Sequence, residues 1–243
     1  MSSDKIRILH TSDVHIGAFT ERWSPQPRKC LHAFKIVVDR ALEEKVDAVL
    51  IAGDFFDHNR IRADVADYVM EQLERLPMPT VILPGNHDPL EQNSVYWRMD
   101  LEGRTPNVYL IKDPEGETVT YPELGLAVWG KPHVSYDDVS LYPLKEPPPR
   151  GPEPWQIAIG HGHYVRDQAD AGRSYPIYPQ EIADCGRDYV ALGHWDAHMN
   201  ISEGGVVAYY PGSPTWVGLS SIVEFSDPDG ERSITVTSFP VSP

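Results

Sequence analysis

The stretch VDAVLIAGD (residues 46–54) is apolar along almost its whole length and ends in Gly53 and Asp54. A half-exposed strand alternates apolar and polar residues, whereas a central strand of a parallel sheet is covered on both faces and is apolar throughout. Residues 46–54 are therefore expected to form a buried central strand that delivers a carboxylate at its carboxyl end.

Two further strands and two helices are expected around this stretch. The apolar runs at 6–13 and 79–86 are short and nearly continuous, which favours strands. The apolar residues of 28–45 and of 63–76 recur at the spacing of one helical face. A β-α-β-α-β order favours parallel strands connected by crossover helices.

The second half of the chain contains shorter segments separated by turn residues. The strands expected there occupy 117–130 (a pair around a turn), 155–163, 189–196 and 205–214. The turn sequence DPDG predicts a terminal hairpin over 219–241. The proline-rich segment 144–154 is interpreted as a surface connection, with a domain linker as the alternative. We expect a single domain over residues 1–243, with two stacked sheets, helices outside them and the hairpin included.

The charge and the cysteine content restrict function and compartment. The formal net charge is −15, which makes nucleic acid a possible but disfavoured partner, because such a surface repels phosphates. Cys30 and Cys185 lack the spacing of a metal or redox motif, as is typical of a reduced cytosolic chain. No signal peptide is evident, and no apolar run approaches the roughly 18 residues of a membrane span. We expect a soluble, cytoplasmic protein, and the sequence indicates no particular protein partner.

Five of the expected strands end in groups that can bind a metal. They are Asp13 and His15 in SDVHIG, Asp54 in AGDFFD, Asn86 and His87 in PGNHD, His161 in GHGH, and His194, Asp196 and His198 in GHWDAH. In α/β sheets, ligands bind beyond the carboxyl ends of the strands. Mixed oxygen and nitrogen ligands suit Mn²⁺, Fe or Zn²⁺ and argue against an all-oxygen calcium site.

Each of these motifs taken alone has a simpler explanation. An aspartate at a strand end is usually a turn or cap residue, GNHD could be only a turn, and a single histidine is usually just hydrogen-bonded. The joint order DxH, GD, GNHD, GH and GH, each after an apolar strand, is poorly explained by turn chemistry. The set as a whole therefore indicates a metal site.

The ordered motif set resembles that of the calcineurin-like metallophosphoesterase superfamily. Within it, YVALGHWD (189–196) and YYPGSP (209–214) resemble the DNA-repair nuclease branch of the Mre11 and SbcD type. The likeness runs from about Ile6 to Ser213, and the terminal hairpin is also typical of the family. It implies a four-layer αββα sandwich, with two mixed β-sheets flanked by helices. It also implies two divalent metal ions, with Mn²⁺ expected ahead of Fe or Zn²⁺.

The resemblance also implies a role for each candidate ligand. Asp13 and His15 would hold the first metal, Asp54 would bridge both, and Asn86, His161 and His194 would hold the second. In the family a further histidine follows two places after the last of these, whereas this chain has Asp196. Since positions i and i+2 of an extended strand point the same way, Asp196 is expected to complete the first site. His198 is the rival ligand, and a weakened first site is the third possibility.

The chemistry implied by the resemblance is phosphoester hydrolysis by a hydroxide that bridges the two metals, with His87 near the leaving group. His58 and Arg60 could approach the substrate phosphate, the alternative being a solvated loop. Asp88 is expected to cap or to orient, as a partner to a ligand imidazole. The sequence favours an exonuclease-like phosphodiesterase for nucleic-acid ends or nucleotides. A phosphomonoesterase for a small metabolite and a non-catalytic metal-binding scaffold are the alternatives.

Overall fold

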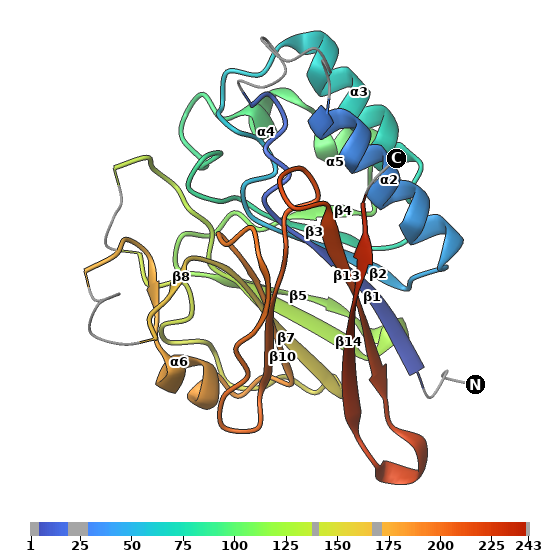
Figure 1. Cartoon of the computed structure of the whole chain (residues 1–243), viewed down its shortest axis with the longest axis vertical. Helices are drawn as coiled ribbons and strands as arrows, with labels where there is room; N and C mark the ends of the chain where they lie inside the picture. The colour runs from blue at the N-terminus through green and yellow to red at the C-terminus, as the bar shows by residue number, and fades with distance from the viewer. Residues whose placement is uncertain (1–4, 19–28, 138–140, 167–171, 242–243) are drawn as a thin grey trace.

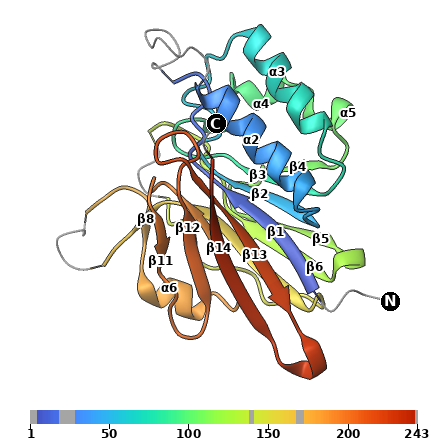
Figure 2. The ribbon, with the colours of Figure 1, turned by 45° about the vertical axis from the view of Figure 1, so that its right-hand side comes forward.

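Two six-stranded sheets pack against each other in the computed structural model, which describes residues 5–18, 29–137, 141–166 and 172–241 (Figure 1). The first sheet has the order β14 (Ser233–Pro240), β13 (Leu219–Ser226), β1 (Lys5–Thr11), β2 (Ala48–Ala52), β3 (Thr80–Leu83) and β4 (Val108–Leu110). The strands β1 to β4 are parallel, and the hairpin β13–β14 joins β1 in antiparallel pairing. The predicted terminal hairpin is therefore confirmed, and it extends the first sheet beside β1 (Figure 2).

The second sheet is also mixed. Its order is β11 (His198–Asn200), β12 (Val207–Pro211), β10 (Tyr189–Gly193), β7 (Trp155–His161), β6 (Leu126–Gly130) and β5 (Glu117–Tyr121). The four central strands are parallel, and the edge strands β5 and β11 pair antiparallel. A separate pair, β8 (His163–Tyr164) and β9 (Pro176–Ile177), follows the end of β7.

Helices cover the outer faces of the two sheets. The larger helices are α2 (Lys29–Glu43) and α3 (Ala63–Glu74), and the short ones are α4 (Val95–Arg98), α5 (Leu101–Arg104) and α6 (Pro179–Asp184), with 3₁₀ turns at η1 (Pro122–Leu124) and η2 (Pro228–Gly230). Figure 1 shows α2 to α5 together on one side of the molecule and α6 on the other. The predicted four-layer αββα arrangement is confirmed, although α6 is only six residues long. None of the helices described is long and apolar enough to span a membrane.

The position of β2 agrees with its sequence. All five of its residues are buried, as a central strand covered on both faces requires. Val49 and Ile51 pack toward the α2 and α3 side, whereas Leu50 and Ala52 pack between the two sheets. The period of two in a strand therefore divides the apolar residues between two separate cores.

The strands end earlier than the sequence suggested. The predicted strands 6–13, 46–54 and 189–196 end at Thr11, Ala52 and Gly193. The chemically useful residues consequently lie in the loops beyond the strands, where the backbone is no longer extended. The elements α4, α5, α6, β4 and β11 were not predicted, because segments this short leave no periodic pattern in the sequence. That residues 1–243 form a single domain stays a prediction.

Candidate metal centre

The loop after β1 runs beside the loop after β2, and this pairing brings the first candidate ligands together. The amide of Asp13 donates to the carbonyl of Gly53 at 3.1 Å, and the amide of His15 donates to the carbonyl of Asp54 at 3.0 Å. Asp13, His15, Asp54 and His194 all have positive φ angles, between 50° and 107°. This conformation is rare for residues other than glycine, and backbone strain of this kind concentrates at functional sites.

Asp54 belongs to two overlapping groups of possible metal ligands. Its carboxylate, with His15 and His87, forms one group; with Asp13 and His161, it forms the other. Within each group, the ligand atoms lie within 4.8 Å of one another. Asp54 Oδ2 is 3.8 Å from His15 Nε2 and 3.2 Å from His161 Nε2. A carboxylate common to two ligand groups has the position that a bridging ligand requires.

The ring of His161 is oriented so that one nitrogen faces only oxygen atoms. Its Nδ1 donates to the carbonyl of Ala52 at 2.9 Å, so Nε2 is the nitrogen that faces the centre. There Nε2 lies 3.1 Å from Asn86 Oδ1 as well as 3.2 Å from Asp54 Oδ2. A lone pair facing two oxygen atoms is repulsive unless a proton or a cation lies between them. The donor set therefore fits a divalent cation.

The first sheet and the second sheet approach closely at this point. A Cβ atom on Gly193 would lie only 1.8 Å from the carbonyl oxygen of Ala52. Glycine is therefore required at the end of β10, so that the loops after β2, β7 and β10 can meet.

Asp13 and Asp54 are both about 2% exposed, and their burial makes the centre need positive charge. Burial, opposed by His161 but reinforced by the charge of Asp54, raises the pKa of Asp13 above its usual value. Burial lowers the pKa of His161, but the charge and hydrogen bond of Asp54 outweigh it and raise this pKa to about 9. Burial also lowers the pKa of His15, but the hydrogen bond to Asp57 and the negative charges of Asp54, Asp13 and Asp57 outweigh it and raise this pKa to about 9. In the metal-free protein both histidines therefore hold a proton beside the buried carboxylates, at the place where a bound cation would supply the positive charge.

His194 connects the two ligand groups. Its backbone amide donates to both carboxylate oxygens of Asp13, at 3.2 and 3.0 Å, and its ring Nδ1 lies 3.1 Å from Asn86 Oδ1. Burial and the positive charge of His161 lower the pKa of His194 to about 3. A neutral imidazole is the form that binds a metal. The structure thus brings together six of the seven predicted ligands: Asp13, His15, Asp54, Asn86, His161 and His194.

A family model described as calcineurin-like phosphoesterase matches residues 6–196, which is most of the chain. The chain belongs to this family. It is 33% identical over 85 residues to the DNA double-strand break repair protein Mre11 of Aeropyrum pernix, covering 34% of this chain and 21% of that protein. It is 23% identical over 222 residues to the uncharacterized metallophosphoesterase YhaO of Bacillus subtilis, covering 86% of this chain and 53% of YhaO.

Solved structures agree with this assignment at the level of the fold. The structure of TT1561 from Thermus thermophilus aligns with a TM-score of 0.61 at 16% identity, over 98% of this chain and 99% of that one. A structure titled as that of a novel archaeal phosphodiesterase aligns with a TM-score of 0.50 at 15% identity, over 96% and 100%. The calcineurin-like fold is therefore confirmed, while the chain spans about half or less of the length of these two curated relatives.

His87 lies at the open side of the centre of this calcineurin-like chain. Its side chain is 45% exposed, and its ring centroid is 4.8 Å from that of His15. The backbone amide of His87 donates to Asp54 Oδ1 at 2.9 Å, and its Nδ1 lies 3.1 Å from the carbonyl of Asp57. With Nδ1 donating there, Nε2 remains for a substrate.

The structure changes the reasoning for Asp196. Because β10 ends at Gly193 and His194 has a φ of 107°, the extended backbone on which the i and i+2 argument rested is absent. Asp196 is exposed; burial raises its pKa, while the charge of His15 opposes this rise. Asp196 therefore lies within electrostatic range of the first ligand group but belongs to neither group of metal-capable side chains described above.

The rival ligand His198 points elsewhere. It lies in β11, where its Nδ1 is 3.2 Å from Ser221 Oγ and its ring is 5.4 Å from that of Tyr209. His198 is not part of either ligand group in the described part of the chain.

The weakly predicted phosphate contacts lie on the loop after β2. His58 is half-buried beside Gly17, and no hydrogen-bond partner of its Nδ1 occurs among the described residues. Arg60 is exposed. Both follow Asp57 on the loop after β2, and among the described residues no hydrogen bond joins either side chain to a candidate ligand.

The structure shows the roles of two further aspartates. Asp57, to which no role was assigned, lies 3.1 Å from Nδ1 of His15; its position three residues after Asp54 was the available signal. Of the two roles expected for Asp88, the structure shows capping of backbone amides and no contact with an imidazole among the described residues. Asp88 accepts hydrogen bonds from the amides of Phe56 and Gly85 and from the Tyr96 hydroxyl, so it ties the loop after β2 to the loop after β3.

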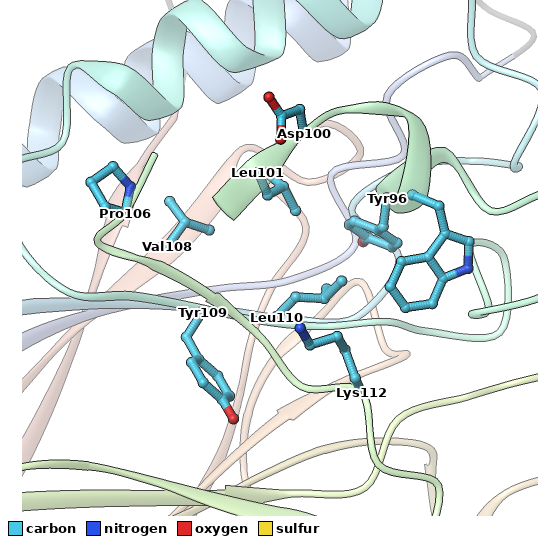
Figure 3. A pocket seen from close by; sticks show the side chains of 9 residues that line it. Tyr96, Asp100, Leu101, Pro106, Val108, Tyr109, Leu110 and Lys112 are labelled. Carbon is cyan, nitrogen blue, oxygen red and sulfur yellow. The ribbon is translucent and has the colours of Figure 1, made fainter. Parts of the chain in front are cut away.

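A cavity of about 540 Å³ lies apart from the metal-ligand candidates, between α4, α5 and the edge strand β4 (Figure 3). Its lining residues are Tyr96, Trp97, Asp100, Leu101, Pro106, Val108, Tyr109, Leu110 and Lys112. None of them is a candidate ligand, so this cavity is not the site of the expected chemistry.

Proposed function

We propose that the chain is a dimetal phosphodiesterase that acts on nucleotides or nucleic-acid ends, in an exonuclease-like manner. The observation that carries the proposal is the position of Asp54 in both ligand groups, with His87 at their open side. Family membership supports phosphoester hydrolysis. The similarity to an Mre11 DNA-repair protein and to an archaeal phosphodiesterase supports a diester rather than a monoester.

We assign the first metal to Asp13, His15, Asp54 and Asp196, and the second to Asp54, Asn86, His161 and His194. The carboxylate-rich first set favours a hard ion, so Mn²⁺ is proposed ahead of Fe or Zn²⁺. When bound, two such cations supply Lewis acidity at a phosphoryl oxygen and make an attacking water more acidic. The rings of His15 and His161 are fixed through Nδ1, by the Asp57 carboxylate and the Ala52 carbonyl, so that Nε2 of each ring faces the position of the metals.

His87 is assigned the role of general acid. Its Nδ1 is held by the carbonyl of Asp57, which leaves Nε2 on an exposed ring to donate a proton to the leaving oxygen. The hydrogen bond from its amide to Asp54 fixes the distance between this ring and the ligand groups. His58 and Arg60 are proposed as weaker contacts to the substrate phosphate.

The net charge of −15 weighs against tight duplex binding, so a small or terminal nucleotide is the proposed substrate. The test compares initial rates on bis(p-nitrophenyl) phosphate and p-nitrophenyl phosphate in Mn²⁺, with Asp54→Asn as the inactive control. We expect the diester to react faster. A faster monoester would instead indicate a phosphomonoesterase, and two bound metals with no turnover in Mn²⁺, Co²⁺, Zn²⁺ or Mg²⁺ would indicate a scaffold.

A further inference from the structure

Trp216 is a large exposed side chain beside the candidate metal centre. Its ring centroid lies 6.2 Å from that of His15, and 40% of its surface is exposed. The next residue, Val217, is 47% exposed. Burial of an indole is favourable, so leaving one in solvent has a cost in free energy. An exposed indole beside a candidate active centre therefore suggests that a ligand covers it.

Hydrogen bonds hold the backbone of Trp216 in a fixed position relative to the metal ligands. The Ser213 hydroxyl donates to the carbonyl of Asp13 at 2.7 Å and accepts the amide of Trp216 at 3.1 Å. The Thr215 hydroxyl donates to the carbonyl of Val14 at 2.6 Å. Both hydroxyl side chains are at most 1% exposed. Trp216 is therefore anchored to the backbone of the loop that carries Asp13 and His15.

The same segment also contacts the other side of the centre. The amide of Ser213 donates to the carbonyl of Asp196 at 2.8 Å. Two buried hydroxyls and this amide thus connect Trp216 to the loop that carries Asp13 and His15 and to the loop that carries Asp196. A backbone fixed in this way suits a recognition surface, because less entropy is lost there when a ligand stacks on the aromatic side chain.

A single lysine lies over the indole of Trp216. Lys29 Nζ lies 5.8 Å from the centroid of the ring, in a protein with a net charge of −15. The lysine therefore lies beside an exposed aromatic ring that is itself close to the candidate metal ligand His15. Aromatic rings combined with basic side chains are the usual means of binding unpaired nucleotides, because every base offers a face for stacking.

From these contacts we propose that Trp216 is the platform on which the base of a nucleotide substrate stacks. This inference rests on the proposed function and specifies its substrate as a phosphodiester that carries a nucleobase. In a nucleotide one sugar ring separates the phosphorus from the base. An indole beside His15 lies where the base arrives when the phosphoryl group is at the metal ligands. Trp216 is thus a specificity-determining residue that acts on binding and leaves the chemical step unchanged.

The experiment compares two diesters with the same leaving group in the presence of Mn²⁺. One is the p-nitrophenyl ester of thymidine 5′-monophosphate, and the other is ethyl p-nitrophenyl phosphate, which has no base. In Trp216→Ala we expect kcat/KM on the thymidine ester to fall about tenfold through KM, the effect of one lost stacking contact. The ethyl ester should react as in the wild type, and Trp216→Phe should retain most of the preference for the thymidine ester.

Trp97→Ala is the matched control, because Trp97 is similarly exposed, at 48%, and lines the cavity beside β4. It should leave the ratio of the two esters unchanged. Equal losses on both esters in Trp216→Ala, or no loss on either, would overturn the proposal while the hydrolase assignment remained intact.

A binding measurement separates this inference from the proposed function. Thymidine 5′-monophosphate should quench tryptophan fluorescence in the Mn²⁺-loaded wild type, and ribose 5-phosphate should not. Trp216→Ala should lose this base-dependent quenching. Base-dependent quenching without hydrolysis of either ester would support the platform and contradict the hydrolase. Equal quenching in the wild type and Trp216→Ala would contradict the platform.

Discussion

Asp57 Oδ1 lies 3.1 Å from Nδ1 of His15, and this contact determines which nitrogen of the imidazole faces the ligand groups. With Nδ1 donating to Asp57, Nε2 is directed toward Asp13 and Asp54, at 3.9 and 3.8 Å. A carboxylate behind a ligand histidine fixes the ring and makes it a stronger base. Asp57 also holds His87, whose Nδ1 donates to the Asp57 backbone carbonyl at 3.1 Å, so one residue positions both histidines.

Asp57→Asn should weaken Mn²⁺ binding at the first site by about 10- to 100-fold, because the amide supports His15 less well than the carboxylate does. Calorimetric titration with Mn²⁺ would measure this change. Asp64→Asn is the matched control, since it removes the same charge from an exposed carboxylate paired with Arg62. Equal Mn²⁺ affinity in Asp57→Asn and the wild type would show that His15 needs no such support.

His87→Ala should lower kcat by about 10²- to 10⁴-fold, which is the usual contribution of a general acid. Because His87 is assigned to proton transfer, the variant should keep its full metal content, measured by elemental analysis after gel filtration. His32→Ala removes an exposed histidine elsewhere and should change neither quantity. Loss of metal from His87→Ala would instead make His87 a ligand.

Asp196→Ala should deplete mainly the first metal site, whereas His198→Ala should leave both sites filled. The difference is expected because His198 is turned toward Ser221, while Asp196 is within electrostatic range of His15. Metal content at increasing Mn²⁺ concentration would measure both variants. The reverse result would mean that the loop rearranges on metal binding and that His198 is the ligand.

Asp13→Asn should make the metal-free protein more stable. The raised pKa of Asp13 means that its ionised form is disfavoured in the fold, and above the unfolded pKa this lowers the free energy of unfolding. The substitution removes this penalty and should therefore raise the melting temperature, by about 2–4 °C for each kcal/mol regained in a chain of this size. Scanning calorimetry without Mn²⁺ should show this higher melting temperature in Asp13→Asn. With Mn²⁺, the melting temperature should rise less in the variant than in the wild type. A lower melting temperature without metal would contradict the argument.

His10 should make the protein sensitive to mild acid. It is fully buried, and burial, with a smaller contribution from His198, lowers its pKa from 6.5 to about 3 despite a hydrogen bond with the Leu192 backbone. Below pH 6.5 the unfolded chain therefore binds a proton that the folded chain does not, and stability falls as the pH falls toward 3.

His10→Asn removes this proton and keeps an amide near the Tyr189 hydroxyl, which lies 2.9 Å from His10 Nδ1. Between pH 7 and pH 5 the wild type should lose about 2 kcal/mol of unfolding free energy that the variant retains. Urea unfolding at both pH values would measure the difference, with His32→Asn as the exposed control. Parallel losses in the wild type and His10→Asn would mean that His10 is protonated in the folded protein.

Much of the fold was predictable because it depends on local patterns. The continuous apolar run at 46–54 predicted the buried strand β2, and the helical spacing at 28–45 and 63–76 predicted α2 and α3. The parallel order predicted that the strand ends would meet, and six candidate ligands do lie together. Short elements such as α5 were missed, because its four residues make only about one helical turn and a periodic pattern needs at least two.

The sequence by itself determined which residue types follow each strand, since this depends only on chain order. Only the tertiary structure decided how those residues meet. The close approach of Gly193 to Ala52, the position of Asp57 behind His15, and the end of β10 before Asp196 all depend on contacts between distant segments. The direction of a side chain beyond a strand follows from backbone angles such as the φ of 107° at His194, and packing rather than local periodicity sets those angles.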